Sequence, residues 1–201
     1  MLLTNSDNSI QINYTPTQKK PIKTEDEIIQ FLLEAFEDNP EKFTPVIIAQ
    51  SETKTFFVDF SHSGETEKQN ILYAVSLLLK TFDCTSYMIV VECWLKSFKT
   101  DNDELEKFKK TNKRISTYDD KDEKLILTKC YKDNNQEMRI FDIIRNGNKA
   151  KLKEDITTKK FKGSLSDIFN FICEKEYKEF EDKDVLKEIL LNHPRIDVWD
   201  H

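Results

Sequence analysis

Glycine is scarce in this chain of 201 residues, which contains only three. Loops that hold nucleotide phosphates need several glycines close together, because the backbone itself must approach the ligand. Gly64, Gly147 and Gly163 lie far apart in the sequence. Their spacing argues against a Walker-type or a Rossmann-type nucleotide site.

Residues that bind transition metals are also few, with four cysteines and three histidines. No two cysteines form a CxxC pair, and the histidines add no spacing typical of a zinc site. Widely separated cysteines within expected strands and helices behave as small apolar residues, which indicates a reducing compartment. We therefore expect no bound metal and no cofactor. The cysteines are Cys84, Cys93, Cys130 and Cys173.

Long apolar runs are missing as well. No stretch of about 18 apolar residues occurs, and the N-terminus lacks the basic segment and apolar run of a signal peptide. The net charge is -6, which argues against a generally basic surface for nucleic acid. We expect a cytoplasmic protein that binds neither membrane nor nucleic acid.

The chain does contain enough apolar material for a core, because 38% of it is hydrophobic and 14 residues are phenylalanine. The segment Tyr87–Leu95 is the longest run of strand-forming residues. Alternate positions point to opposite faces of a strand, and apolar residues occupy both faces here. The pattern predicts a central strand that is covered on both sides.

Helix and turn signals predict the other elements. Thr24 and Glu27 have capping-box spacing before a helix that ends at Asn39, and a long helix is expected over 65–82. Asn146-Gly147 favours the type I′ turn of a hairpin. Strands are expected at 45–49, 55–60, 123–130, 137–145 and 149–154, and a last helix at 182–191 with Val185, Leu186, Ile189 and Leu190 facing inward.

These elements predict an α+β fold with a mainly antiparallel sheet of about five to six strands and helices packed largely on one face. The strand–helix–strand order across 55–95 would allow one parallel crossover. The expected parts are a flexible N-terminal arm at 1–23, an α+β core at 24–157 containing a charged loop at 97–122, a C-terminal helical segment at 158–194 packed on the core, and an acidic tail at 195–201.

A single carboxylate, Glu92, interrupts the central strand. Burial beside apolar neighbours raises a carboxyl pKa and can suit a general acid or base. Glu123 or Asp142 on facing strands could then supply a second carboxylate for a metal-dependent hydrolase or nuclease. The lysine spacing of restriction-type nucleases is missing after Glu92, however. The sequence therefore favours an ordinary ion pair of Glu92 with Arg139 or Lys129, and no catalytic residue.

The charged loop at 97–122 is the other prominent feature, because long segments without regular structure inside compact domains are usually functional or disordered. Its basic residues surround one phenylalanine and could grip a partner, although acidic residues offset them and a solvated loop is the alternative. Trp199 near the C-terminus would either fold back onto the domain or anchor another chain. The candidate binding residues are Lys107, Phe108, Lys110, Lys113, Arg114 and Trp199.

Two short segments carry a resemblance to a known family. They are Val91-Glu92-Cys93-Trp94 and, after the loop, the residues from Asp120 to Leu127. Together they resemble the pattern E-A-W … D-R-x-E-x-L of small α+β proteins of bacteria and their phages, for which no activity is established. Cys93 replaces a small residue, Lys121 replaces an arginine, and the loop is longer here. The resemblance covers roughly residues 65–155 and implies the fold and a phage context, but no activity.

These observations favour a non-enzymatic interaction or assembly protein. It would bind a protein partner, or a second copy of itself, through the loop at 97–122 and the termini. The alternative is a divergent metal-dependent hydrolase or nuclease that uses Glu92 with Glu123 or Asp142.

Overall fold

A seven-stranded antiparallel sheet, in the order β6-β5-β4-β3-β1-β2-β7, forms the centre of the computed structural model. The α+β class and the antiparallel sheet are as predicted, with slightly more strands than expected. The structure describes residues 24–95, 110, 119, 121–133, 135–159, 168–172, 174–180 and 182–200. Its elements are α1 (Glu25–Asp38), a 3-10 turn η1 (Pro40–Lys42), β1 (Val46–Gln50), β2 (Lys54–Asp59), α2 (Glu65–Thr81), β3 (Ser86–Leu95), β4 (Asp122–Tyr131), β5 (Gln136–Asn146), β6 (Lys149–Lys159), α4 (Glu174–Lys178), α5 (Lys183–Leu191) and β7 (Ile196–Asp200).

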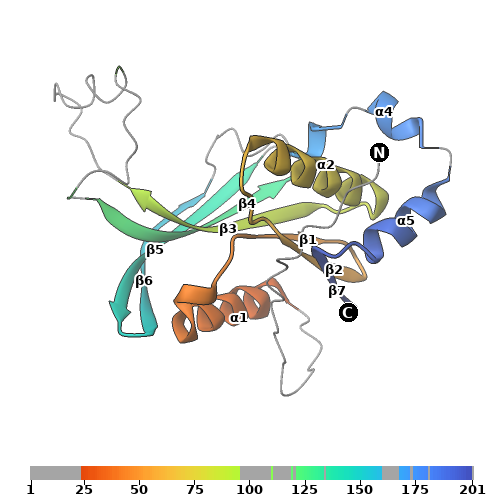
Figure 1. Cartoon of the computed structure of the whole chain (residues 1–201). Helices are drawn as coiled ribbons and strands as arrows, with labels where there is room; N and C mark the ends of the chain where they lie inside the picture. Colours follow the sequence, from red (N-terminus) through yellow and green to blue (C-terminus); the bar gives the residue numbers. More distant parts are fainter. Residues whose placement is uncertain are drawn as a thin grey trace.

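Helices lie on both faces of the sheet (Figure 1). Helices α2 and α5 cover one face, where Val75 and Leu78 of α2 join the larger core. Helix α1 covers the opposite face, because its apolar stripe of Ile28, Leu32 and Phe36 packs in a second core. The predicted concentration of helices on one face therefore holds for α2 and α5 but not for α1. No helix in the described part of the chain is long and apolar enough to cross a membrane.

Strand β3 lies in the middle of the sheet, paired with β1 on one side and β4 on the other. Its side chains alternate between the two cores. Tyr87 and Ile89 belong to the core under α2, and Met88 and Val90 belong to the core under α1. All four are buried, so the predicted central strand, covered on both sides, is confirmed.

Local sequence signals set most of the element boundaries. The Thr24 hydroxyl accepts a hydrogen bond from the Glu27 amide at 3.3 Å, and the Glu27 carboxylate accepts one from the Thr24 amide at 3.0 Å, which confirms the capping box. Gly147 adopts a φ of 63° in the β5–β6 turn, a conformation that costs glycine little.

Strands β2 and β3, joined by α2, are parallel to each other because β1 lies antiparallel between them.

Helix α5 buries a narrower stripe than its sequence predicts. Leu186 and Leu190 are buried against the core, whereas the side chains of Val185 and Ile189 are 49% and 59% exposed. The helix lies at the edge of the α2 layer (Figure 1), so only one side of it meets the core. The expectation that Val185 and Ile189 face inward is wrong.

The C-terminal residues form a strand where the sequence analysis expected an acidic tail. Residues 196–200 make β7, which pairs with β2 along its whole length. The Arg195 guanidinium holds the entry to this strand, donating to the Ser61 carbonyl at 2.7 Å and to Glu67. Ile196 and Val198 then pack against the core under α2. The sequence does not predict this strand, because an alternating pattern of only five residues is a weak strand signal and two of the five are charged aspartates.

Trp199 ties β7 to the opposite face of the sheet, and we expect it to contribute to stability. Its ring lies 4.5 Å from that of Phe57 and 5.6 Å from that of Phe31 in α1, centroid to centroid. The substitution Trp199→Ala should lower the free energy of unfolding by about 2 kcal/mol, less than for a fully buried tryptophan. Urea denaturation measures this change.

The second tryptophan offers a matched control. Trp94 is 42% exposed near the end of β3, so Trp94→Ala should change stability by no more than about 0.5 kcal/mol. Equal effects of the two substitutions would contradict a structural role for Trp199.

Candidate functional site

Glu92 lies in the outer half of β3, on the face of the sheet that α1 covers. It is in register with Leu125 of β4, whose side chain belongs to the core under α1. Its carboxylate accepts a hydrogen bond from Arg145 Nη2 at 2.8 Å. The partners expected from the sequence bind elsewhere: Arg139 pairs with Glu154, and Lys129 pairs with Glu25.

Arg145 is the centre of a cluster that joins four elements. Its Nε and Nη2 donate to the two carboxylate oxygens of Glu123 at 2.8 and 2.9 Å, a bidentate arrangement that is favourable for a guanidinium. Its Nη1 donates to Glu41 of η1 at 3.0 Å. One cation from β5 therefore lies among three carboxylates, Glu92 from β3, Glu123 from β4 and Glu41 from η1. We call these four residues the Arg145 cluster.

The pKa values of the two neighbouring carboxyl groups in the Arg145 cluster are shifted in opposite directions. Burial, and then the neighbouring Glu123 carboxylate, raise the pKa of Glu92 to about 7. The bidentate hydrogen bonds from Arg145 lower the pKa of Glu123. The two shifts are consistent with a single proton that stays bound to Glu92 and forms a hydrogen bond to the Glu123 carboxylate. Glu92 is thus a carboxyl group that titrates near neutral pH.

The structure brings Glu123 to Glu92 but does not bring Asp142 there. Asp142 is in register with Lys124, next to the pair of Leu125 and Phe141, so it points to the opposite face of the sheet. There it pairs with Lys124, which also donates to Asp155 at 3.1 Å. Within the described residues, no group of three or more His, Cys, Asp or Glu side chains could hold a metal ion.

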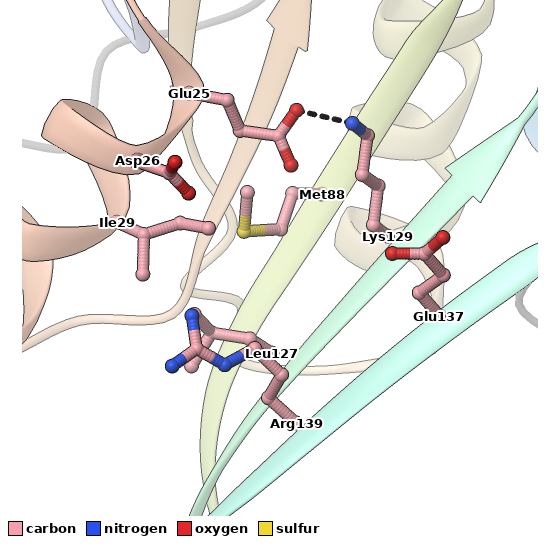
Figure 2. Close-up of a pocket in the computed structure, with 8 residues that line it drawn as sticks. All are labelled: Glu25, Asp26, Ile29, Met88, Leu127, Lys129, Glu137 and Arg139. Carbon is pink, nitrogen blue, oxygen red and sulfur yellow. Dashed lines mark hydrogen bonds and ion pairs between the residues drawn. The ribbon is translucent and has the colours of Figure 1, made fainter. Parts of the chain in front are cut away.

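A small cavity opens between the N-terminal half of α1 and strands β3 to β5 (Figure 2). Its volume is about 140 Å³. Ile29, Met88 and Leu127 supply its apolar lining, and the ion pair of Lys129 with Glu25 lies beside it. Asp26, Glu137 and Arg139 complete the walls. Neither Glu92 nor Glu123 lines the cavity, so the carboxyl group with the raised pKa and this cavity are separate features.

The predicted binding residues are described only in part. Lys107, Phe108, Lys113 and Arg114 lie outside the described residues, and Lys110 is exposed. Trp199 packs on Phe57 and Phe31, and its indole N–H donates to Asp197 at 3.0 Å. Its role in binding stays a prediction.

Sequence reasoning missed two features at the loop end of the sheet. The first is Arg145 as the partner of Glu92, which depends on the β4–β5 register and has no signal in the sequence. The second is the exposure of two apolar side chains, Trp94 (42%) and Ile144 (53%). The Lys121 ammonium lies 5.0 Å from the centre of the Trp94 ring, within range of a cation–π interaction.

The raised pKa of Glu92 predicts a pH-dependent loss of stability. Its contribution to the folded state is fully present below the ordinary pKa near 4.5 and is lost as the pH rises through about 7. Glu92→Gln keeps the hydrogen-bonding shape without a charge, and should raise the free energy of unfolding at pH 8 by about 1 kcal/mol after allowance for solvent screening. Chemical denaturation at several pH values measures the difference, which should disappear at pH 4.5.

Glu41→Gln is the matched control, because Glu41 binds the same guanidinium but its side chain is 70% exposed. This variant should follow the wild-type pH profile. A Glu92→Gln variant that is less stable than wild type at pH 8 would show that the ionised Glu92 stabilises the cluster, contrary to this interpretation.

Comparison of the chain with family models, with curated proteins and with solved structures finds no match. The resemblance to small proteins of bacteria and phages therefore stays a prediction.

Proposed function

We propose that this protein is a non-enzymatic interaction or assembly protein that binds a protein partner at the loop end of the sheet. The binding surface would comprise the loop at 97–122 and two exposed side chains next to it, Trp94 on the face of α1 and Ile144 on the opposite face. The expected setting is the cytoplasm, or the virion if the chain is phage-encoded.

The register of β3 and β4 carries this proposal. Leu95, the last residue of β3, is paired with Asp122, the first residue of β4. Residues 96–121 therefore connect two neighbouring strands at the position where a two-residue turn would suffice. The pairing of β3 with β4 is complete at these two residues, so the sheet does not need a long connection between them. Long insertions of this kind commonly carry binding functions.

The surroundings of the loop support the same conclusion. Trp94 and Ile144 have two of the most exposed large apolar side chains among the described residues, and aromatic residues are enriched in binding surfaces. Trp94 lies on the same face as the Arg145 cluster, which fastens β3, β4, β5 and η1 together, and Ile144 lies on the opposite face. A binding loop attached to such a fixed base loses less entropy on binding than one attached to a mobile base.

The C-terminus contributes to the proposal less than the sequence analysis expected. Trp199 is occupied by its contacts with Phe57 and Phe31, so we assign the main binding role to the loop end. The arm at 1–23 lies outside the described residues.

Replacement of residues 97–120 by Asn-Gly tests this proposal. The new turn joins Lys96 to Lys121 in the observed register, so the free energy of unfolding should stay within about 1 kcal/mol of wild type. Capture of the partner in a pull-down, or self-association in sedimentation experiments, should be lost. Unchanged capture and unchanged self-association in the folded variant would overturn the proposal.

Two variants with several substitutions each in the loop make this test more specific. In one, the five candidate residues Lys107, Phe108, Lys110, Lys113 and Arg114 are changed to serine, and binding should be lost as in the deletion. In the matched control, Asp101, Asp103 and Glu104 are changed to the corresponding amides, and binding should persist. Loss in both variants would show that binding does not depend specifically on the five residues and would contradict their assignment.

A second candidate function, a metal-dependent hydrolase or nuclease, is favoured by one observation. Glu92 and Glu123 approach each other, and Glu92 has a pKa of about 7. If this candidate is correct, the protein should cleave plasmid DNA or single-stranded RNA with Mg²⁺ or Mn²⁺. Cleavage should be lost in Glu123→Gln and retained in Glu41→Gln. No cleavage by the wild-type protein would overturn this candidate and leave the interaction function standing.

A further inference from the structure

Strands β6 and β7 form the two edges of the sheet in the described part of the chain. An edge strand turns unpaired N–H and C=O groups outward, and these groups can pair with a strand of another molecule. Strand β6 has 11 residues and β7 has five. The longer edge, β6, is therefore the one that most needs protection from such pairing.

Helix α1 supplies the partner of one outward group of β6. The Leu152 amide donates a hydrogen bond to Glu37 Oε1 at 2.7 Å. Amides of an antiparallel strand alternate between its two sides, and this amide points away from β5 because its acceptor belongs to α1. The Glu37 oxygen therefore occupies the position that a carbonyl oxygen of an added strand would take.

Contacts on either side of Glu37 in the sequence hold its side chain at this edge. Phe36 packs with Ala150 and Leu152 in the core under α1, and the Asp38 carboxylate lies 2.9 Å from the Lys149 ammonium. Figure 1 shows α1 next to the β5–β6 hairpin, in agreement with these contacts. An added strand would lie about 4.8 Å from β6, in the space that the Glu37 side chain occupies.

The sequence of β6 carries two other features that oppose pairing at an edge. Asp155 is an extra residue in the register of β5 with β6, and such a bulge interrupts the regular spacing of edge groups. Lys151 and Lys153 are exposed, and lysines on an edge disfavour the approach of another strand. The regular ladder between the turn and the bulge includes Leu152, which is the residue that Glu37 caps.

We propose that α1, through Glu37, closes the β6 edge to pairing with β6 of a second copy of this chain. Two identical antiparallel edges present matching N–H and C=O groups to each other, so the second copy is the strand that this contact excludes. The contact is an autoinhibitory device of the fold. It does not depend on the function proposed above.

Amide hydrogen exchange, measured on dilute protein, tests the cap itself. In the wild type, the Leu152 amide should exchange at least about a hundredfold more slowly than in an unstructured peptide of residues 149–159. Glu37→Ala should accelerate exchange at Leu152 at least about tenfold and leave the Lys151 and Lys153 amides, which point towards β5, as they were. Glu37→Gln keeps an acceptor oxygen and should restore slow exchange. Exchange of the wild-type amide at the rate of the peptide, or no acceleration in Glu37→Ala, would overturn the proposal.

Sedimentation of the same variants at rising concentration tests the excluded pairing. In about 0.5 M salt, which screens the lysines, Glu37→Ala should associate at a concentration at least about fivefold lower than the wild type. Glu34→Ala is the matched control, because Glu34 lies on the same helix and accepts a hydrogen bond from Gln30 instead. This control and Glu37→Gln should both behave as the wild type does, and urea denaturation shows that each variant is folded.

The associated form of Glu37→Ala should regain slow exchange at Leu152, because a strand of the second copy then pairs there. Equal association of the Glu37→Ala and Glu34→Ala variants, or association without slowed exchange at Leu152, would overturn the proposal. Neither result depends on capture of a partner by the loop at 97–122, so failure of this proposal and failure of the loop proposal are distinguishable.

Discussion

Burial of one strand on both faces is the constraint on which the rest of this structure depends. Four consecutive residues of β3, from Tyr87 to Val90, are buried, and they alternate between the core under α2 and the core under α1. Burying an apolar side chain of this size contributes about 1.5 to 3 kcal/mol, which is large against a net stability of about 5 to 15 kcal/mol for a typical domain. Because both cores share this strand, neither layer of helices can be displaced without exposing part of it.

The two layers of helices bury only the first half of β3. Beyond that point, charged groups take the place of apolar packing. From Val91 onward the side chains are partly or largely exposed, and each face of the outer half carries a group of ions. On the face of α1, Arg145 lies among Glu41, Glu92 and Glu123; on the other face, Lys124 lies between Asp142 and Asp155. Single pairs at a surface add little stability, whereas bidentate and networked pairs add more. Each group has more carboxylates than its cation neutralises, and in the Arg145 cluster burial and then the neighbouring Glu123 raise the pKa of Glu92.

Most of the fold could be predicted because its signals are local. The capping box at Thr24, the Asn146-Gly147 turn and the two-sided apolar pattern of β3 each depend on neighbouring residues, and each was found as predicted. What failed depends on contacts between distant residues. Strand β7 forms because β2 offers it an unpaired edge and Arg195 reaches Ser61, and Val185 is exposed because α5 lies at the edge of its layer. The candidate site divides in the same way: Glu92 stands out in the sequence, but its partner Arg145 follows only from the register of β4 with β5.

Stability and binding are consequently assigned to different parts of the same sheet. The buried half of β3 tolerates little change, since every residue there contacts a core. The outer half ends at the pair of Leu95 and Asp122, where a connection of any length can be inserted at a small cost in loop entropy. The Arg145 cluster lies in the outer half and holds three strands and η1 together. Since Glu92 titrates near pH 7, the charge of this junction changes within the physiological range, while the two cores, which contain few ionisable groups, keep their packing.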